Sequence, residues 1–167
     1  MESLQQHTKL DPLLSEIATR RDDLILLTQN LIRIPTLNPP GENYRDICEF
    51  LNKRLTKHGF NTEMVRAYDT PGDSDKYPRW NLVARREGTG SGECVHFNSH
   101  IDVVEVGSGW TQDPFGGALV DGKIYGRGAC DMKGGLAASI IAVESFIHTN
   151  PDFQGAIEIS ATGDEES

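Results

Sequence analysis

A short apolar segment that leads into three consecutive acidic residues constrains this chain more than any other feature. Residues 156–161 form a mainly apolar run, and Asp164, Glu165 and Glu166 follow closely after it. A run of this length between turn signals predicts a buried β-strand. Adjacent carboxylates repel one another, whereas a multivalent cation would turn that repulsion into binding energy. The segment therefore predicts a strand that leads into a metal site.

The rest of the chain alternates helical and extended patterns. Apolar spacing predicts helices over residues 11–34, 44–58 and 134–148. Short β-prone runs predict strands over residues 61–67, 80–86, 93–99 and 154–161. Asp121-Gly122 is typical of a two-residue hairpin turn within 118–125. This order predicts an α/β fold, with a mixed, largely parallel sheet and helices on both faces.

Composition narrows the class of protein. The chain has 167 residues, of which 37% are hydrophobic and 25% charged, as expected for a globular domain with a core. A net charge of −9 argues against nucleic acid and anionic membranes as partners. No segment approaches the run of about twenty apolar residues that spans a bilayer. The three cysteines lack CxxC spacing and the first residues lack a signal-peptide pattern, so we expect a cytoplasmic protein.

Two earlier segments offer ligands that are compatible with the acidic end of the chain. His100 and Asp102 follow the predicted strand 93–99, and residues two apart in extended backbone face the same way. The Asp102 carboxylate could then accept the second ring N–H of a metal-bound His100. Asp131 lies in a glycine-rich stretch, which lets the backbone turn tightly around a site. Its two oxygens could bridge two cations.

Each pattern alone also fits a plainer interpretation. His100 and Asp102 could form a surface hydrogen-bonded pair, Asp131 could cap the helix that follows, and the acidic end could be a solvated turn. Cys130 could be a thiolate ligand, although a small buried residue is its expected role. The conjunction favours a metal site, because nitrogen and oxygen ligands at strand exits suit Zn²⁺ or a related divalent ion.

These residues resemble the acetylornithine deacetylase / succinyl-diaminopimelate desuccinylase family. This group of co-catalytic zinc hydrolases also includes aminoacylases, carboxypeptidases and dipeptidases. The resemblance covers the chain from about residue 10 to its end. It is carried by five ordered segments, at residues 98–104, 110–115, 121–128, 131–135 and 162–166.

The resemblance implies two divalent metal ions, with Zn²⁺ expected and Co²⁺ or Mn²⁺ as alternatives. It implies that His100, Asp131 and Glu166 are metal ligands, and that Asp131 bridges the two ions and precedes a cis peptide bond. Asp102 is implied as the carboxylate that orients the histidine. Glu165 is implied as the general base and acid.

The resemblance also implies an activity and an organisation. The expected reaction is hydrolysis of the amide bond of N-acyl amino acids by metal-activated water, of the deacetylase or desuccinylase type. The alternatives are a metallo-carboxypeptidase or dipeptidase acting on short peptides, and a catalytically inactive metal-binding module. Family members are more than twice as long. Residues 1–167 are therefore expected to be the amino-terminal part of the catalytic domain of a longer homodimeric enzyme, inactive without its lid domain and the rest of that domain.

Overall fold

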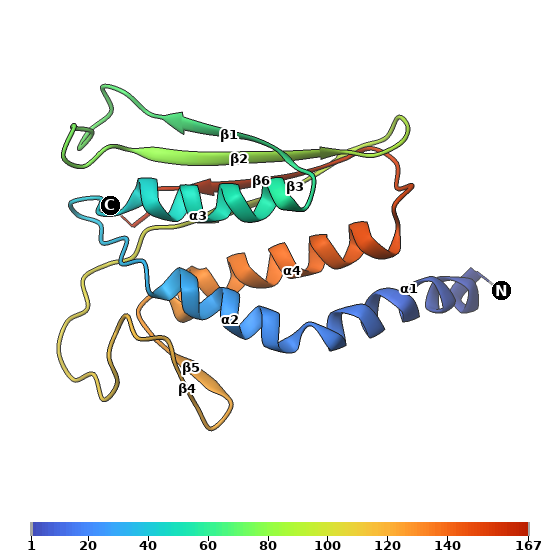
Figure 1. The fold of residues 1–167 in the computed structure, drawn as a ribbon, viewed down its shortest axis with the longest axis horizontal. Coiled ribbons are helices and arrows are strands. Elements are labelled where there is room, and N and C mark those ends of the chain that lie inside the picture. The colour runs from blue at the N-terminus through green and yellow to red at the C-terminus, as the bar shows by residue number, and fades with distance from the viewer. Residues whose placement is uncertain (1, 167) are drawn as a thin grey trace.

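A computed structural model describes residues 2–166, with side chains from residue 10 onward, as an α/β fold (Figure 1). Its helices are α1 (Glu2–Thr19), α2 (Arg21–Ile32), α3 (Tyr44–Lys57) and α4 (Gly134–Thr149), with a short π-helical segment η1 (Ala129–Lys133). Its strands are β1 (Asn61–Arg66), β2 (Trp80–Glu87), β3 (Cys94–His100), β4 (Ala118–Val120), β5 (Lys123–Tyr125) and β6 (Ala156–Thr162).

The main sheet is mixed, with the strand order β1-β2-β6-β3. The β3–β6 pair is parallel and places His100 opposite Thr162, while β1–β2 and β2–β6 are antiparallel. A parallel pair needs a crossover connection, and α4 lies in the crossover between β3 and β6. The predicted α/β class with a mixed sheet is confirmed. Its parallel share is smaller than predicted, because β1 pairs directly with β2, the next strand along the chain.

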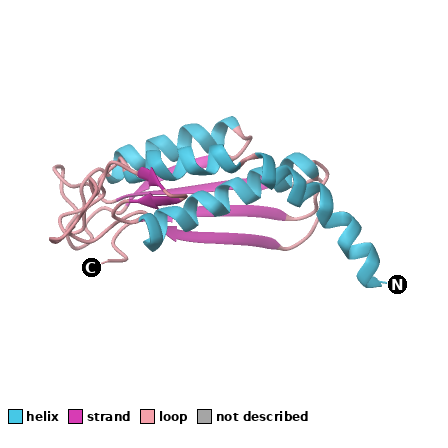
Figure 2. Ribbon diagram, turned by 90° about the horizontal axis from the view of Figure 1, so that it is seen from below, coloured by secondary structure: helices cyan, strands magenta, loops and turns pink. Residues whose placement is uncertain are grey.

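The core lies between one face of this sheet and the helices. Leu82 and Ala84 of β2 and Ile159 of β6 belong to one buried apolar cluster together with side chains of α2, α3 and α4. Arg85 and Glu158 point to the other face, where they form an ion pair at 3.3 Å. In the described part of the chain the helices cover one face, in place of the two predicted (Figures 1 and 2). Polar residues that alternate along the strands account for the open face.

The helix predicted over 11–34 is two helices. Arg20 leaves the helical conformation between α1 and α2, with φ −97° and ψ 15°, and its guanidinium pairs with Glu144 of α4. The other two predicted helices and the hairpin agree with α3, α4 and the β4–β5 pair. No helix within residues 2–166 is both long and apolar enough to cross a membrane.

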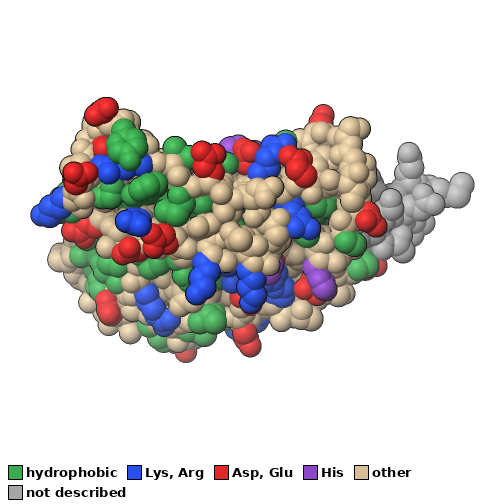
Figure 3. Space-filling model, turned by 45° about the horizontal axis from the view of Figure 1, so that its top comes forward, with side chains coloured by type: hydrophobic (Ala, Val, Ile, Leu, Met, Phe, Trp, Pro, Cys, Tyr) green, Lys and Arg blue, Asp and Glu red, His purple; other side chains and the backbone are tan. Residues whose placement is uncertain are grey.

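The parallel β3–β6 pair places two strand ends at one end of the molecule, where the loops also gather (Figure 2). The loop after α2 lies along the extension of β3, since Val103 N–H donates to Thr36 O and Asn38 N–H donates to Val103 O, each at 2.9 Å. Figure 3 shows acidic and basic side chains interspersed on the face that it draws, so the net charge of −9 is not gathered into one patch there.

Candidate metal centre

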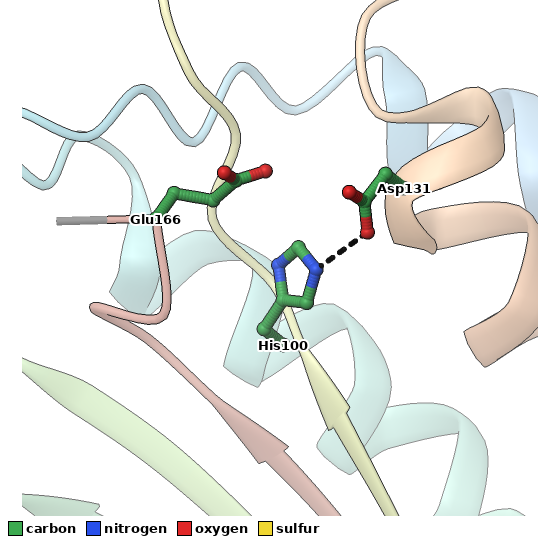
Figure 4. Close-up of side chains that lie close together, drawn as sticks. All are labelled: His100, Asp131 and Glu166. Atoms are coloured by element: carbon green, nitrogen blue, oxygen red, sulfur yellow. Dashed lines mark hydrogen bonds and ion pairs between the residues drawn. The ribbon is translucent and has the colours of Figure 1, made fainter.

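Three side chains from separate parts of the chain converge at the carboxyl ends of β3 and β6. His100 is the last residue of β3, Asp131 lies in η1, and Glu166 follows β6. One ligand atom from each lies within 4.8 Å of the others. Figure 4 shows the three side chains around one common space. The sequence predicted this convergence from the strand exits and the glycine-rich segment.

His100 is buried, with 7% of its surface exposed, and both ring nitrogens have partners. Its Nδ1 lies 3.1 Å from the carbonyl oxygen of Asp102 and 3.6 Å from the Oδ1 carboxylate oxygen of that residue. Its Nε2 lies 3.0 Å from Oδ1 of Asp131. Burial alone would lower the pKa of His100, but the hydrogen bonds to Asp131 and Asp102, together with nearby carboxylates, raise it.

Asp102 lies behind the imidazole and is completely buried. Its Oδ2 accepts hydrogen bonds from Asn38 Nδ2 and from the Glu166 N–H, both at 3.0 Å. Its Oδ1 accepts no hydrogen bond from the described residues. The sequence predicted that this carboxylate would accept the ring proton of His100, and the structure places the Asp102 carbonyl oxygen nearer to that proton. Both acceptors favour the tautomer with its proton on Nδ1, which leaves Nε2 free to bind a metal.

Asp131 lies in a backbone segment of irregular conformation. Its φ of −128° and ψ of 98° interrupt η1, and its peptide bond to Met132 is cis, as the resemblance predicted. Gly128, with φ 80°, begins the segment, and a Cβ atom there would lie 2.5 Å from Cγ1 of Val103. Glycine at this position lets the segment approach the extension of β3. The neighbouring Cys130 is exposed, so the expectation of a buried cysteine was wrong.

Lys133 anchors the same segment from the other side. Its side chain is completely buried, and its Nζ donates to Leu31 O at 3.0 Å and to Ile34 O at 2.7 Å, at the end of α2. Burial lowers the pKa of Lys133 to about 7. Sequence analysis missed this role, because a lysine next to glycines gives no sign that it is buried.

Glu165 and Glu166 approach the site differently. Glu165 is exposed, and its Oε2 lies 3.9 Å from His100 Nε2. Glu166 belongs to the converging group. Burial raises the pKa of Glu166, and the neighbouring carboxylates of Asp131, Asp102 and Glu165 add to the effect, whereas His100 opposes it. A divalent cation would neutralise the negative charge that these neighbouring carboxylates place around Glu166.

The family model described as peptidase family M20/M25/M40 matches residues 96–167. A succinyl-diaminopimelate desuccinylase from Cereibacter sphaeroides is 38% identical over 146 residues, which cover 86% of this chain and 35% of that protein. These findings confirm the resemblance that the sequence motifs predicted.

Solved structures agree with the fold. Human carnosine dipeptidase 1 superimposes with a TM-score of 0.83 and 25% identity over 94% of this chain and 35% of its own. The dipeptidase Dug1p from Saccharomyces cerevisiae gives a TM-score of 0.82 at 23% identity, covering 95% of this chain and 35% of its own. The chain thus spans about a third of the length of the relatives it matches.

Proposed function

We propose, from the kinship of this chain with peptidase family M20/M25/M40, that it supplies the metal-binding part of a hydrolase that cleaves the amide bond of N-acyl amino acids. The family match includes His100, Asp131, Glu165 and Glu166. A desuccinylase is the relative with 38% identity, which favours an N-acyl amino acid as substrate. Hydrolysis of short peptides at the same site is the second candidate, favoured by the likeness to carnosine dipeptidase.

The contact between His100 and Asp131 is the main observation that supports a metal site. His100 Nε2 and Asp131 Oδ1 are 3.0 Å apart. Two ligand atoms at this distance share either a proton, in a hydrogen bond, or a metal ion, and the acceptors at Nδ1 favour the tautomer that frees Nε2 for the metal. Glu166 adds a third acceptor to the same space. A nitrogen and two carboxylates are a donor set that suits Zn²⁺.

Each residue of the proposed site has its own role. His100, Asp131 and Glu166 would hold the metal, and Asp102 would orient the imidazole. A divalent cation bound there would lower the pKa of a water ligand and polarise the substrate carbonyl. Glu165, whose Oε2 lies 3.9 Å from His100 Nε2, would accept a proton from water and deliver it to the leaving amine.

We also propose that the activity belongs to a longer protein. The chain spans about a third of the length of the matched relatives, so substrate contacts, further metal ligands and a dimer interface would lie elsewhere in that protein. Zn²⁺ is the proposed ion, with Co²⁺ or Mn²⁺ as alternatives, and the cytoplasm is the proposed location.

The test is a substrate panel on the longest natural protein that contains this chain, loaded with Zn²⁺. The panel includes N-succinyl-diaminopimelate, N-acetylornithine and a dipeptide. We expect kcat/KM for an N-acyl amino acid to exceed that for the dipeptide by about tenfold or more. A preference for the dipeptide would establish the second candidate. Inertness toward all substrates with Zn²⁺ bound would identify a metal-binding module without activity.

A further inference from the structure

The acidic turn after β6 is fixed by contacts that do not use the side chains of its two glutamates. The N–H of Gly163 donates to Asn81 Oδ1 at 2.9 Å, and the N–H of Glu166 donates to Asp102 Oδ2 at 3.0 Å. A Cβ atom on Gly163 would lie 2.3 Å from Cε2 of Tyr44, so the turn packs directly against that ring. The backbone that carries the glutamates is therefore closely held.

Asp164, in the middle of this turn, binds Tyr44 and Arg79. The Tyr44 hydroxyl donates to Asp164 Oδ1 at 3.0 Å and accepts a hydrogen bond from the Asp164 N–H at 3.3 Å. Nε of Arg79 lies 2.9 Å from Asp164 Oδ2. Asp164 has φ 66°, a left-handed conformation that few residues other than glycine adopt, although Asn and Asp adopt it more often than the rest. Its carboxylate contacts hold the chain in that conformation.

Arg79 is itself rigidly placed just before β2. It is 6% exposed, and its Nη1 donates to Pro40 O at 2.7 Å. Its backbone N–H donates to Asp73 Oδ1 at 3.0 Å, and its guanidinium lies over the Tyr44 ring, 5.4 Å from the centroid. Arg79 and Tyr44 together bind one carboxylate, that of Asp164.

We propose that Asp164 is a positioning residue, which acts with Tyr44 and Arg79 to set the direction in which Glu165 and Glu166 enter the metal site. Three acidic residues are adjacent in the sequence, and this arrangement separates their tasks. The carboxylate of Asp164 is bound by Tyr44 and Arg79, so that Glu165 and Glu166 face the metal site. The inference rests on the proposed function, because positioning matters only if these glutamates act there.

The first test measures Zn²⁺ affinity by titration calorimetry on the 167-residue chain. Asp164→Asn keeps the shape of the side chain but leaves Arg79 without its counter-ion, and we expect affinity to fall by about tenfold or more. Asp23→Asn is the matched control, since Asp23 is also paired with arginines but lies among α2, α3 and α4. It should lower stability toward urea and leave Zn²⁺ affinity unchanged.

The second test repeats Asp164→Asn in a Glu166→Gln background. If Asp164 acts by positioning Glu166, the added loss of affinity should be less than about twofold, because the positioned ligand is already gone. An equal loss in both backgrounds, or no loss in the wild-type background, overturns the positioning role. Failure of the proposed function gives a different result, since Glu166→Gln alone would then leave Zn²⁺ affinity unchanged.

A metal-free readout keeps the two proposals separate. The Glu166 N–H donates to buried Asp102, so its exchange with solvent reports whether the turn holds its position. We expect Asp164→Asn to speed this exchange by about tenfold or more relative to the amides of β6, and Asp23→Asn to leave the ratio unchanged. An unchanged ratio in Asp164→Asn overturns the positioning role whether or not the chain binds Zn²⁺.

Discussion

Two clusters of acidic side chains in this molecule balance their charge in opposite ways. In the core cluster, Asp23 and Glu144 face the guanidinium groups of Arg20 and Arg54, which join α2, α3 and α4. Glu144 lies 2.6 Å from Arg20 Nη2 and 2.7 Å from Arg54 Nη2, with 1% of its side chain exposed. The core cluster thus contains one cation for each anion.

The metal-site cluster holds Asp131, Glu165 and Glu166, and the imidazole Nε2 of His100 lies 3.0 Å from Asp131 Oδ1 and 3.9 Å from Glu165 Oε2. No lysine or arginine of residues 10–166 forms an ion pair with these three carboxylates. The comparison teaches that clustered acids alone do not indicate a metal. The metal-site cluster differs by its deficit of positive charge, which a divalent cation would remove.

The largest expected effect is on the catalytic rate, with no change in stability. In the longer protein, Glu165→Gln should lower kcat by about 10²–10⁴-fold, the contribution typical of a general base. Glu165 is 64% exposed on its side chain, so the urea midpoint should stay unchanged. Steady-state kinetics on the Zn²⁺-loaded enzyme give the comparison. A Glu165→Gln enzyme with full activity would remove Glu165 from the mechanism.

Removing the central anion of the core cluster should have the next largest effect. Glu144→Ala leaves the partly buried Arg20 and Arg54 with Asp23 as their one shared counter-ion, which costs about 3 kcal/mol of unfolding free energy. Urea unfolding measures the loss. The control is Glu158→Ala, because the Arg85–Glu158 pair is more exposed and should contribute much less to stability. If Glu144→Ala also abolished Zn²⁺ binding, the two clusters would not be independent.

The carboxylate behind the imidazole should have an intermediate effect on the metal site. Asp102→Asn removes the buried charge that lies 3.6 Å from His100 Nδ1 and weakens the hold on the Glu166 N–H. We expect Zn²⁺ affinity to fall by about 10–100-fold, as for other residues that orient a ligand. Titration calorimetry measures it. An unchanged affinity would show that the Asp102 carbonyl oxygen alone orients the ring.

The smallest effect concerns the pH dependence of the core cluster. Hydrogen bonds from Arg54, opposed by burial and assisted by Arg20, lower the pKa of Asp23 below its ordinary value of 3.8. A carboxyl group with a lowered pKa in the folded state binds protons more readily in the unfolded state, so it stabilises above about pH 4 and the contribution is lost at more acidic pH. Wild type should exceed Asp23→Asn by less than about 1 kcal/mol at pH 6, and the difference should shrink toward pH 3. A constant difference would contradict the lowered pKa.

The sequence predicted most of the local structure and the proximity of three proposed ligands. Helical spacing located α3 and α4, and Asp121-Gly122 located the β4–β5 hairpin. The family resemblance proposed His100, Asp131 and Glu166 as metal ligands, and the strand ends and the glycine-rich stretch predicted that these side chains would lie close together, as they do. These predictions use only residues that are close together in the sequence.

What the sequence missed depends on contacts between distant segments. Lys133 is buried because its Nζ reaches the carbonyl groups at the end of α2, about a hundred residues earlier. Arg79 and Tyr44 bind Asp164 from two other parts of the chain. Neither a lone lysine nor a lone arginine shows such a partner in its neighbouring residues. The sequence also missed the antiparallel direction of β2 against β6, because it depends on pairing between distant segments.

Zn²⁺ titration of the 167-residue chain and of Asp131→Ala tests the central claim most directly, with exposed Glu63→Ala as the control. Asp131 Oδ1 lies 3.0 Å from His100 Nε2, so its removal should lower Zn²⁺ affinity by at least about 100-fold, or about 2.7 kcal/mol, while Glu63→Ala leaves it unchanged. Zn²⁺ binding that is equally strong in wild type and Asp131→Ala would contradict the assignment of His100, Asp131 and Glu166 as a metal centre.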